Sequence, residues 1–167
     1  VNNLYGLPMT QYLPLNNFQW VDNVDNFNVL EIAEDSPVGN ILEVDLEYPK
    51  ELHDYHNDFP FCFERKKIGK QVKLIGDLEN KYNYIIHYRN LQQCLKHNLK
   101  LKKIHKILKF NQSNWLAKYI EMNNYHRTLA SNKFEENFFK LLNNAIFGKT
   151  MENIEKRVVV KLVQQWE

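Results

Sequence analysis

The stretch SNKFEENFFKLLNNAIFGKT, from Ser131 to Thr150, decides the helical part of the fold. Ser131 is a suitable N-cap, and the two glutamates that follow suit the positive end of a helix. The spacing of the apolar residues predicts a helix that runs to Phe147 and is stopped by Gly148. One stripe of this helix is apolar, and a second stripe is mixed. The apolar stripe comprises Phe134, Phe138, Leu141 and Ala145, and the mixed stripe comprises Asn137, Lys140, Asn144 and Phe147.

The rest of the chain predicts an α+β fold, with a sheet-rich middle followed by two long helices. A helix is predicted from Ser113, its N-cap, because apolar residues follow at helical spacing. Apolar and acidic residues alternate from Leu42 to Tyr48, which predicts a strand with one solvent-exposed, acidic face. Residues 1–20 are predicted to be irregular because prolines and asparagines interrupt any period. Further strands are predicted at 72–75, 82–88, 99–110 and 158–163, and helices at 27–33, 50–57 and 90–98.

Length and composition indicate a folded domain. The chain has 167 residues, of which 44% are hydrophobic and 13% aromatic, and this is enough for a core. No apolar run could span a membrane, and no signal-peptide pattern is present. Two cysteines without a paired motif favour an intracellular protein, nuclear or cytoplasmic. Because the sequence begins with Val1 and ends within a structured pattern, we expect a piece of a longer protein.

The charges are segregated along the sequence although the net charge is only +2. Eleven acidic side chains and one basic side chain lie between Asp22 and Asp58, and nine basic side chains and no acid lie between Lys81 and Lys118. This pattern predicts one acidic and one basic surface. Charge alone is equally compatible with two solvated faces.

The mixed stripe of the 131–150 helix has the composition of a nucleotide site. Lys140 and Asn144 are neighbours on a helix surface, and Phe147 lies one turn further. A lysine can meet phosphates, and an aromatic ring beside a glycine leaves room for a base. The alternative is that Lys140 is solvated and Phe147 belongs to the core.

The segment Phe139 to Thr150 resembles the fingers helix of family B DNA polymerases. That motif reads Lys, three residues, Asn-Ser, one residue, Tyr-Gly. Lys140, Asn144 and Gly148 stand at matching positions, and Phe147 replaces the tyrosine, keeping the ring without its hydroxyl. A serine in the motif is replaced by Ala145.

The N-terminus carries a second resemblance. Residues VNNLYG resemble the tail of the family's first palm motif, Asp-x-x-Ser-Leu-Tyr-Pro, with Asn3 and Gly6 at the variant positions. Both variants resemble the protein-primed branch found in viruses, linear plasmids and self-synthesising transposons. The long stretch between the motifs suits the terminal-protein region that this branch inserts there. The resemblance implies a palm edge at 1–20, this insertion at 21–112, fingers at 113–150 and a return to the palm at 151–167.

The resemblance implies a DNA-directed DNA polymerase with protein priming, which transfers nucleotides from dNTPs onto a DNA template-primer with two Mg²⁺ ions. Both metal-binding aspartates would lie outside this chain, so the isolated piece is expected to be inactive. The backbone carbonyl of Val1 would complete the shell of one metal ion. Tyr5 would lie under the incoming sugar and exclude a 2′-hydroxyl. Lys140 would grip the triphosphate, and the pocket would be lined by Asn144, Phe147 and Gly148.

A second triphosphate cation is expected on the preceding helix. Arg127 is the better candidate, and Lys133 is the alternative. The basic segment is expected to contact DNA phosphates or a terminal protein, and the acidic block to face a protein. The basic residues concerned are Lys96, Lys100, Lys102, Lys103, Lys106 and Lys109. An alternative function is a non-catalytic module, derived from such a polymerase, that binds DNA or protein through this segment.

Three other patterns imitate functional sites. In the stretch Asp45 to Pro49 the aspartate is too close to the tyrosine for the palm motif, so its acids are expected on the wet face of a strand. His53 and His56 lack a second ligand cluster, so we expect solvated or hydrogen-bonded histidines rather than a metal site. Gly148-Lys149-Thr150 lacks the upstream glycine of a phosphate-binding loop, because position 143 is asparagine.

Overall fold

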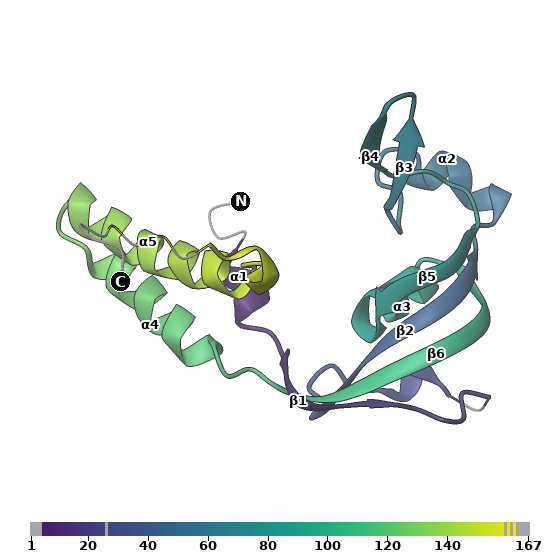
Figure 1. Ribbon diagram of the computed structural model, residues 1–167, viewed down its shortest axis with the longest axis horizontal. Helices are drawn as coiled ribbons and strands as arrows, with labels where there is room; N and C mark the ends of the chain where they lie inside the picture. The colour runs from purple at the N-terminus through teal and green to yellow at the C-terminus, as the bar shows by residue number, and fades with distance from the viewer. Residues whose placement is uncertain (1–4, 26, 159, 161, 163–167) are drawn as a thin grey trace. The chain divides into compact units, whose positions relative to one another are not determined.

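The computed structural model describes residues 5–25, 27–158, 160 and 162 (Figure 1). The chain divides into two compact units. We call residues 14–113 the sheet unit and residues 1–13 with 114–167 the helical unit. Strands and helices both occur, so the predicted α+β class is confirmed. No helix in the described ranges is both long and apolar enough to cross a membrane.

The sheet unit is built on four strands in the order β1-β6-β2-β5. These are β1 (Leu13–Trp20), β2 (Val38–Glu47), β5 (Lys81–His87) and β6 (Lys100–Ser113). The central strand β2 pairs antiparallel with both β5 and β6. Helix α3 (Tyr88–Lys96) follows β5 and packs Leu91 and Cys94 into the core. Short elements complete the unit: η1 (Val29–Glu31), η2 (Lys50–Leu52) and α2 (His53–His56).

The alternation of β2 forms the centre of this core, as the sequence predicted. Leu42 and Val44 are fully buried and Leu46 is 1% exposed. They pack with residues of β5, α3 and β6 in one cluster. Because strand side chains alternate between the two faces, the acidic residues of β2 lie on the opposite face.

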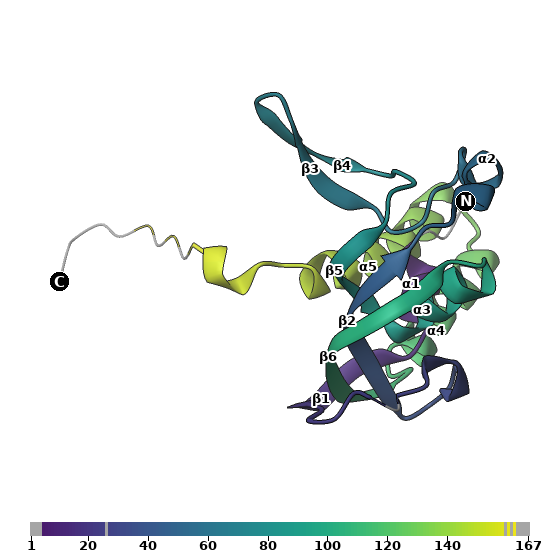
Figure 2. The same cartoon turned by 90° about the vertical axis from the view of Figure 1, so that its right-hand side faces the viewer.

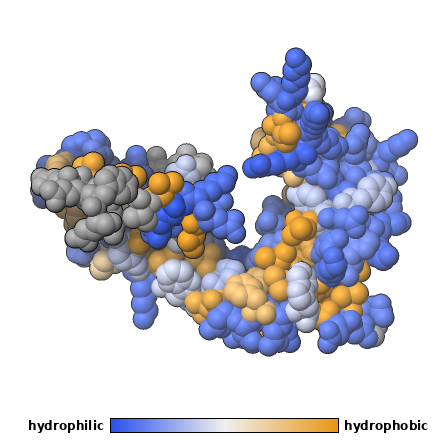
Figure 3. Space-filling view, in the orientation of Figure 1, coloured by the Kyte–Doolittle hydropathy of each residue, from blue (hydrophilic) through white to orange (hydrophobic). Residues whose placement is uncertain are grey.

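A two-stranded hairpin extends from the four-stranded sheet (Figure 2). It consists of β3 (Glu64–Ile68) and β4 (Gln71–Ile75), which pair antiparallel. Gly69 takes φ +60° in the connecting turn, a conformation that glycine adopts without steric cost. Figure 3 shows mainly hydrophilic residues over the hairpin region, with a smaller hydrophobic patch among them.

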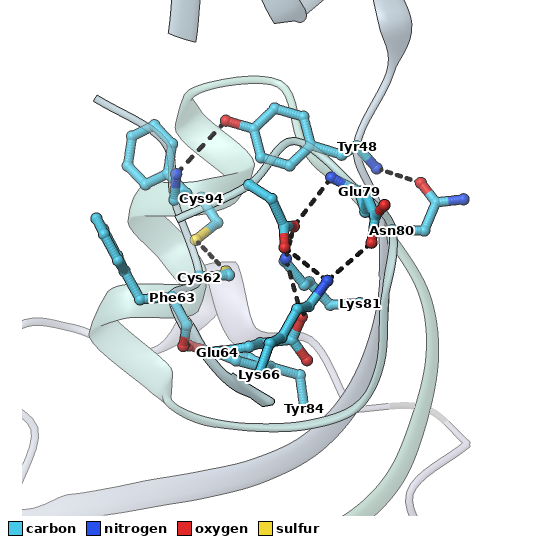
Figure 4. A network of polar contacts seen from close by, with 12 residues as sticks. Tyr48, Cys62, Phe63, Glu64, Lys66, Glu79, Asn80, Lys81, Tyr84 and Cys94 are labelled. Atoms are coloured by element: carbon cyan, nitrogen blue, oxygen red, sulfur yellow. Dashed lines mark hydrogen bonds and ion pairs between the residues drawn. The ribbon is translucent and has the colours of Figure 1, made fainter. Parts of the chain in front are cut away.

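A cluster of ion pairs joins the base of this hairpin to β5 (Figure 4). The ammonium of Lys81 is buried, lies 3.0 Å from a carboxylate oxygen of Glu64 and contacts Asp77. Lys66 lies 2.6 Å from Asp77 and 2.8 Å from Glu79. Burial raises the pKa of Asp77, but hydrogen bonds from the two lysines outweigh it and lower the pKa to about 2. The buried lysine is thus compensated by carboxylates, as a buried charge requires.

The helical unit contains α1 (Gly6–Met9), α4 (Ala117–Leu129), α5 (Lys133–Thr150) and η3 (Ile154–Lys156). Helices α4 and α5 lie side by side (Figure 1). A short connection joins them, as in other helical hairpins. Met9 of α1, Leu116 and Ile120 form a small core, against which Ile146 and Phe147 of α5 pack.

Two strands differ from the sequence prediction. Residues 13–20 were predicted to be irregular, yet they form β1. This strand lies at the edge of the sheet, where Pro14 is tolerated because an edge strand does not need every amide for pairing. Asn17 has φ 58°, which explains why the pattern is interrupted there. The charged strand β3 was not predicted at all, whereas the predicted 99–110 strand is confirmed and extends to Ser113.

The ends of several helices also differ from the sequence prediction. Ser113 ends β6, and α4 begins only at Ala117 without a side-chain cap. The N-cap of α5 is Asn132, whose side chain accepts from the amide of Glu135. Ser131 instead donates its hydroxyl to the Glu135 carboxylate, so both polar residues satisfy the helix start. Helix α5 continues through Gly148 to Thr150. The predicted 27–33 helix is only a 3-10 turn, and the predicted 158–163 strand falls partly outside the described residues.

Candidate nucleotide-binding site

Amide side chains hold α4 and α5 together at the centre of the helical unit. The side chain of Asn123 donates to Oδ1 of Asn143 at 2.8 Å, and Asn143 donates to Oδ1 of Asn124 at 3.1 Å. Asn123 is 1% exposed and Asn143 is 6% exposed. Since buried amides need partners, this cluster fixes how α5 lies along α4. One turn away, Phe139 stacks on His126 with ring centroids 5.2 Å apart.

The mixed stripe of α5 lies beside this interface. Lys140 and Asn144 are exposed, and Phe147 is half-buried against the small core. Tyr5 packs on Phe147 with ring centroids 4.4 Å apart and an interplanar angle of 31°. Two residues that the sequence assigned to nucleotide binding from opposite ends of the chain are therefore in contact. Lys140 makes no ion pair with any residue that the structure describes.

Gly148 follows Phe147 in α5 and is exposed. A Cβ atom placed at Gly148 would meet no other atom within 4 Å, apart from its own chain neighbours and helix backbone. Helix α5 reaches its end only at Thr150, whose hydroxyl donates to the carbonyl of Phe147. The glycine is thus part of the helix and does not stop it, contrary to the sequence prediction, and its role beside a base stays a prediction.

Both candidates for the second cation share one acid. Arg127 of α4 lies 3.0 Å from Glu136 of α5, and Lys133 lies 2.7 Å from the same carboxylate. Hydrogen bonds from Lys133 and Arg127 lower the pKa of Glu136, so it carries its charge at neutral pH. Arg127 is less exposed than Lys133 and bridges the two helices. Any phosphate that bound here would compete with Glu136.

The sequence interpretation missed the residues that support this site. Asn123, Asn124 and Asn143 were not singled out, and the signal lay in asparagines facing each other from two predicted helices. The predicted apolar stripe of α5 is not its packed face, since Phe134, Phe138 and Leu141 are exposed. The helix packs instead through Asn143 and its neighbours.

The basic segment lies mainly on β6, opposite the acidic residues of β2. The two strands pair antiparallel with two register shifts, and Glu43 lies opposite Lys106 and Glu47 opposite Lys100. Lys106 lies 3.1 Å from Glu43, and Lys102 lies 2.9 Å from Glu47. The predicted separate acidic and basic surfaces are therefore wrong for this part of the sheet, because strand pairing places the two blocks side by side.

Three lysines of the basic segment form no ion pair with a described residue, although Lys103 lies opposite Asp45 across the two strands and its charge helps to lower the pKa of Asp45. Lys96 and Lys103 are exposed, and Lys109 is half-buried. Lys100 approaches Glu47 at 3.6 Å and is mostly exposed. His105 contacts Asp45 at 2.9 Å, and hydrogen bonds from the backbone of Asn83 and from His105 lower the pKa of Asp45. The remaining positive charge on β6 is therefore smaller than the sequence indicated.

No group of three or more histidine, cysteine or acidic side chains is placed to hold a metal ion within the described ranges. Val1, whose carbonyl was assigned to a metal, lies outside them. His56 is buried and shares a hydrogen bond of 2.8 Å with the hydroxyl of Tyr48, which confirms the expectation of a hydrogen-bonded histidine.

The fold is similar to solved structures of a polymerase. It matches phi29 DNA polymerase in its orthorhombic crystal form with a TM-score of 0.62 and 19% identity, over 92% of this chain and 26% of that chain. It matches the complex of phi29 DNA polymerase with primer-template DNA and incoming nucleotide substrates with a TM-score of 0.55 and 17% identity, over 89% of this chain and 25% of that chain. The post-translocation complex with primer-template DNA gives a TM-score of 0.51 and 18% identity, with coverages of 89% and 24%.

No family model matches the sequence, and no curated protein matches it. The chain spans about a quarter of the length of the polymerase that it matches. The likeness extends over both units, since it covers about nine-tenths of the chain. At the level of the fold, this chain resembles phi29 DNA polymerase, a protein-primed family B polymerase, as its two sequence motifs predicted.

Proposed function

We propose that this chain is the fingers-bearing part of a protein-primed DNA-directed DNA polymerase, and that α5 binds the incoming dNTP. The contact between Tyr5 and Phe147 carries this proposal. The sequence resemblance assigns both rings to the nucleotide, and their centroids are 4.4 Å apart. Phe147 lies on α5, the helix that also bears Lys140. The similarity in fold to a polymerase supports the same assignment.

Each residue of the stripe has a role that its chemistry allows. Lys140 is exposed and makes no ion pair among the described residues, so its ammonium can meet a triphosphate. Asn144 offers both a donor and an acceptor to the nucleotide. Phe147 offers an aromatic face to a base pair, and Gly148 leaves space beside it. Tyr5, whose ring packs on that of Phe147, would limit the space for the sugar by steric contact.

Arg127 is the preferred second cation. Its guanidinium is held between α4 and α5 by Glu136, whereas Lys133 is 81% exposed at its side chain. A held guanidinium loses less freedom on binding a phosphate, and its fork matches phosphate oxygens. The Mg²⁺ ions of such an enzyme would need carboxylates that the described residues do not supply. We assign no metal-dependent step to this chain.

The test is nucleotide binding by the 167-residue chain, with a dNTP compared with the corresponding deoxynucleoside. Lys140→Ala should weaken triphosphate binding by about tenfold, the lower limit for a charge-assisted hydrogen bond. Deoxynucleoside binding should not change, because it lacks the phosphates. Lys149→Ala is the matched control, since Lys149 lies past Gly148 and is paired with Glu152 at 2.5 Å. Equal effects of the two variants would refute the role of Lys140.

Tyr5 is tested by sugar selection. If the ring excludes a 2′-hydroxyl, Tyr5→Ala should bring the affinities for a deoxyribonucleotide and its ribonucleotide closer together. Tyr5→Phe should preserve the difference, because exclusion is steric. A chain that binds both sugars equally before the change would contradict the assignment.

Template-primer DNA and a terminal protein are the proposed macromolecular partners. For DNA, the preferred contacts are the lysines that form no ion pair among the described residues, namely Lys96, Lys103 and Lys109. The paired lysines, Lys100, Lys102 and Lys106, would first have to leave Glu43 or Glu47. Binding of primer-template DNA that survives loss of the nucleotide site would favour the alternative, a non-catalytic binding module.

A further inference from the structure

The two cysteines of the chain meet inside the sheet unit. Cys62 precedes β3 and Cys94 lies in α3, and their sulfur atoms are 3.6 Å apart (Figure 4). Both are free thiols, and they are 9% and 3% exposed. The sequence, with its unpaired spacing, gave no sign of this contact.

The loop that carries Cys62 is held on both sides. The amide of Phe61 donates to the hydroxyl of Tyr48 at 3.5 Å, and the hydroxyl of Tyr84 donates to the carbonyl of Phe63 at 3.0 Å. A Cβ atom at Gly76 would lie only 2.7 Å from the ring of Phe63, so the loop rests directly on the glycine backbone. Cys62 itself has φ 59°, an unusual conformation for a residue other than glycine. The fold therefore holds the two sulfur atoms together.

A pocket of about 370 Å³ lies beside the two cysteine residues. Its lining includes Pro60, Phe61, Tyr84 and Asn90 as well as the two cysteines. A small molecule in this pocket would lie against both cysteine residues. The lining is partly polar, since it also includes His87 and Gln93.

We propose that Cys62 and Cys94 form a reversible oxidation site, at which a small disulfide of the glutathione class converts the two thiols into an intramolecular disulfide. This proposal is independent of the nucleotide site. The reaction needs only the two sulfur atoms, which must each move by less than an ångström toward the normal bond length of about 2.05 Å.

The steps balance as thiol-disulfide exchange. The thiolate of Cys94 attacks one sulfur of the glutathione disulfide, forms a mixed disulfide and releases one glutathione thiolate. Cys62 then loses its proton, attacks the Cys94 sulfur and releases the second glutathione thiolate. The two leaving thiolates take up the two protons. The protein loses two electrons and two protons, and the small disulfide is reduced to two thiols.

We take Cys94 as the first nucleophile because its pKa is the lower of the two thiol pKa values. The hydrogen bond between the two sulfur atoms raises the pKa of Cys62, and burial adds to this effect. The same hydrogen bond lowers the pKa of Cys94. Thiolate is the reactive form, so the partner that gives up its proton more easily reacts first.

The experiment places the 167-residue chain in buffers with graded ratios of reduced to oxidised glutathione, followed by alkylation and mass spectrometry. Because the chain has two cysteines, only one intramolecular disulfide can form. We expect a product that is lighter by two hydrogen atoms, with a cross-linked peptide containing both residues. The equilibrium constant for its formation should be at least about tenfold larger in native buffer than in urea, since the fold raises the effective concentration of one thiol at the other.

Cys62→Ser provides the second measurement, because it removes the resolving thiol. This variant should stop at a glutathione adduct on Cys94, whereas the unchanged chain should accumulate none. An equilibrium constant in native buffer that does not exceed the value in urea would overturn the proposal. Stable glutathione adducts in place of the disulfide in the unchanged chain would overturn it too. Both of these outcomes are read from the unchanged chain, so they remain decisive if Cys62→Ser does not fold.

Discussion

Replacing Asn143 by leucine tests whether the amide cluster sets the position of α5. Asn143 is 6% exposed and makes two side-chain hydrogen bonds, to Asn123 and Asn124. After Asn143→Leu, the amide nitrogen of Asn123 loses its partner at a residue that is 1% exposed. Oδ1 of Asn123 already has no partner among the described residues, so the whole side chain would be unsatisfied. Asn124 is half-buried, so its side-chain oxygen can accept a hydrogen bond from water instead of from Asn143.

The expected loss of stability follows from that count. One newly unsatisfied buried donor costs about 1–3 kcal/mol, and the half-buried partner adds little, so we expect about 2 kcal/mol. Replacing both partners by apolar side chains of similar shape is nearly neutral. The double variant Asn123→Leu with Asn143→Leu should therefore be more stable than the sum of the single losses predicts. Urea unfolding followed by the helical circular-dichroism signal measures all three variants.

The control substitution lies one position further along the same helix. Asn144→Leu changes an exposed residue, so it should leave the unfolding midpoint nearly unchanged but weaken nucleotide binding. Asn143→Leu should lower the midpoint. Equal midpoints for Asn143→Leu and the unchanged chain, or purely additive losses in the double variant, would refute the reasoning about the cluster.

Three further predictions concern the sheet unit. Lys81→Met should cost about 1–3 kcal/mol in urea unfolding, because Glu64 and Asp77 lose a charged hydrogen-bond partner and only Lys66 remains beside them. Burial lowers the pKa of His56 and His87, so the unfolded chain takes up protons first and stability should fall as the pH drops below about 6.5. His56→Gln should reduce this loss in thermal unfolding between pH 7 and pH 5. Lys103→Gln should flatten the salt dependence of DNA binding more than Lys106→Gln, because Lys106 is already paired with Glu43. Equal slopes for the two variants would place the DNA contacts elsewhere.

Much of the fold could be predicted because the buried side chains of a strand or helix recur with the period of that element. Leu42, Val44 and Leu46 alternate with acids, and this pattern specified the core strand β2. Prediction from apolar spacing failed for strands whose apolar and polar residues do not alternate with burial. β3 reads as a run of charges, since its residues contact solvent or the ion pairs of the hairpin. β1 was missed because an edge strand tolerates Pro14 and the unusual backbone of Asn17.

The candidate site was only partly predictable for a related reason. Motif spacing placed Lys140, Asn144 and Phe147 on one side of a helix, and the structure keeps them there. Spacing within one helix cannot show which face meets another helix. Asn143 packs against α4 while the apolar Phe134 and Leu141 remain exposed, so hydrophobicity alone pointed to the wrong face.

The charge pattern along the sequence differs from the distribution of charge on the folded sheet. The acidic and basic blocks lie far apart in the sequence, which suggested two surfaces of opposite sign. Antiparallel pairing of β2 with β6 places them opposite each other, and carboxylates then neutralise much of the basic strand. Exposed pairs of this kind contribute little stability and are weakened by salt. They still matter for recognition, because a polyanion must displace them before it can bind. The positive charge available to DNA on β6 is therefore set less by the number of lysines than by which of them, such as Lys103, form no ion pair with a described residue.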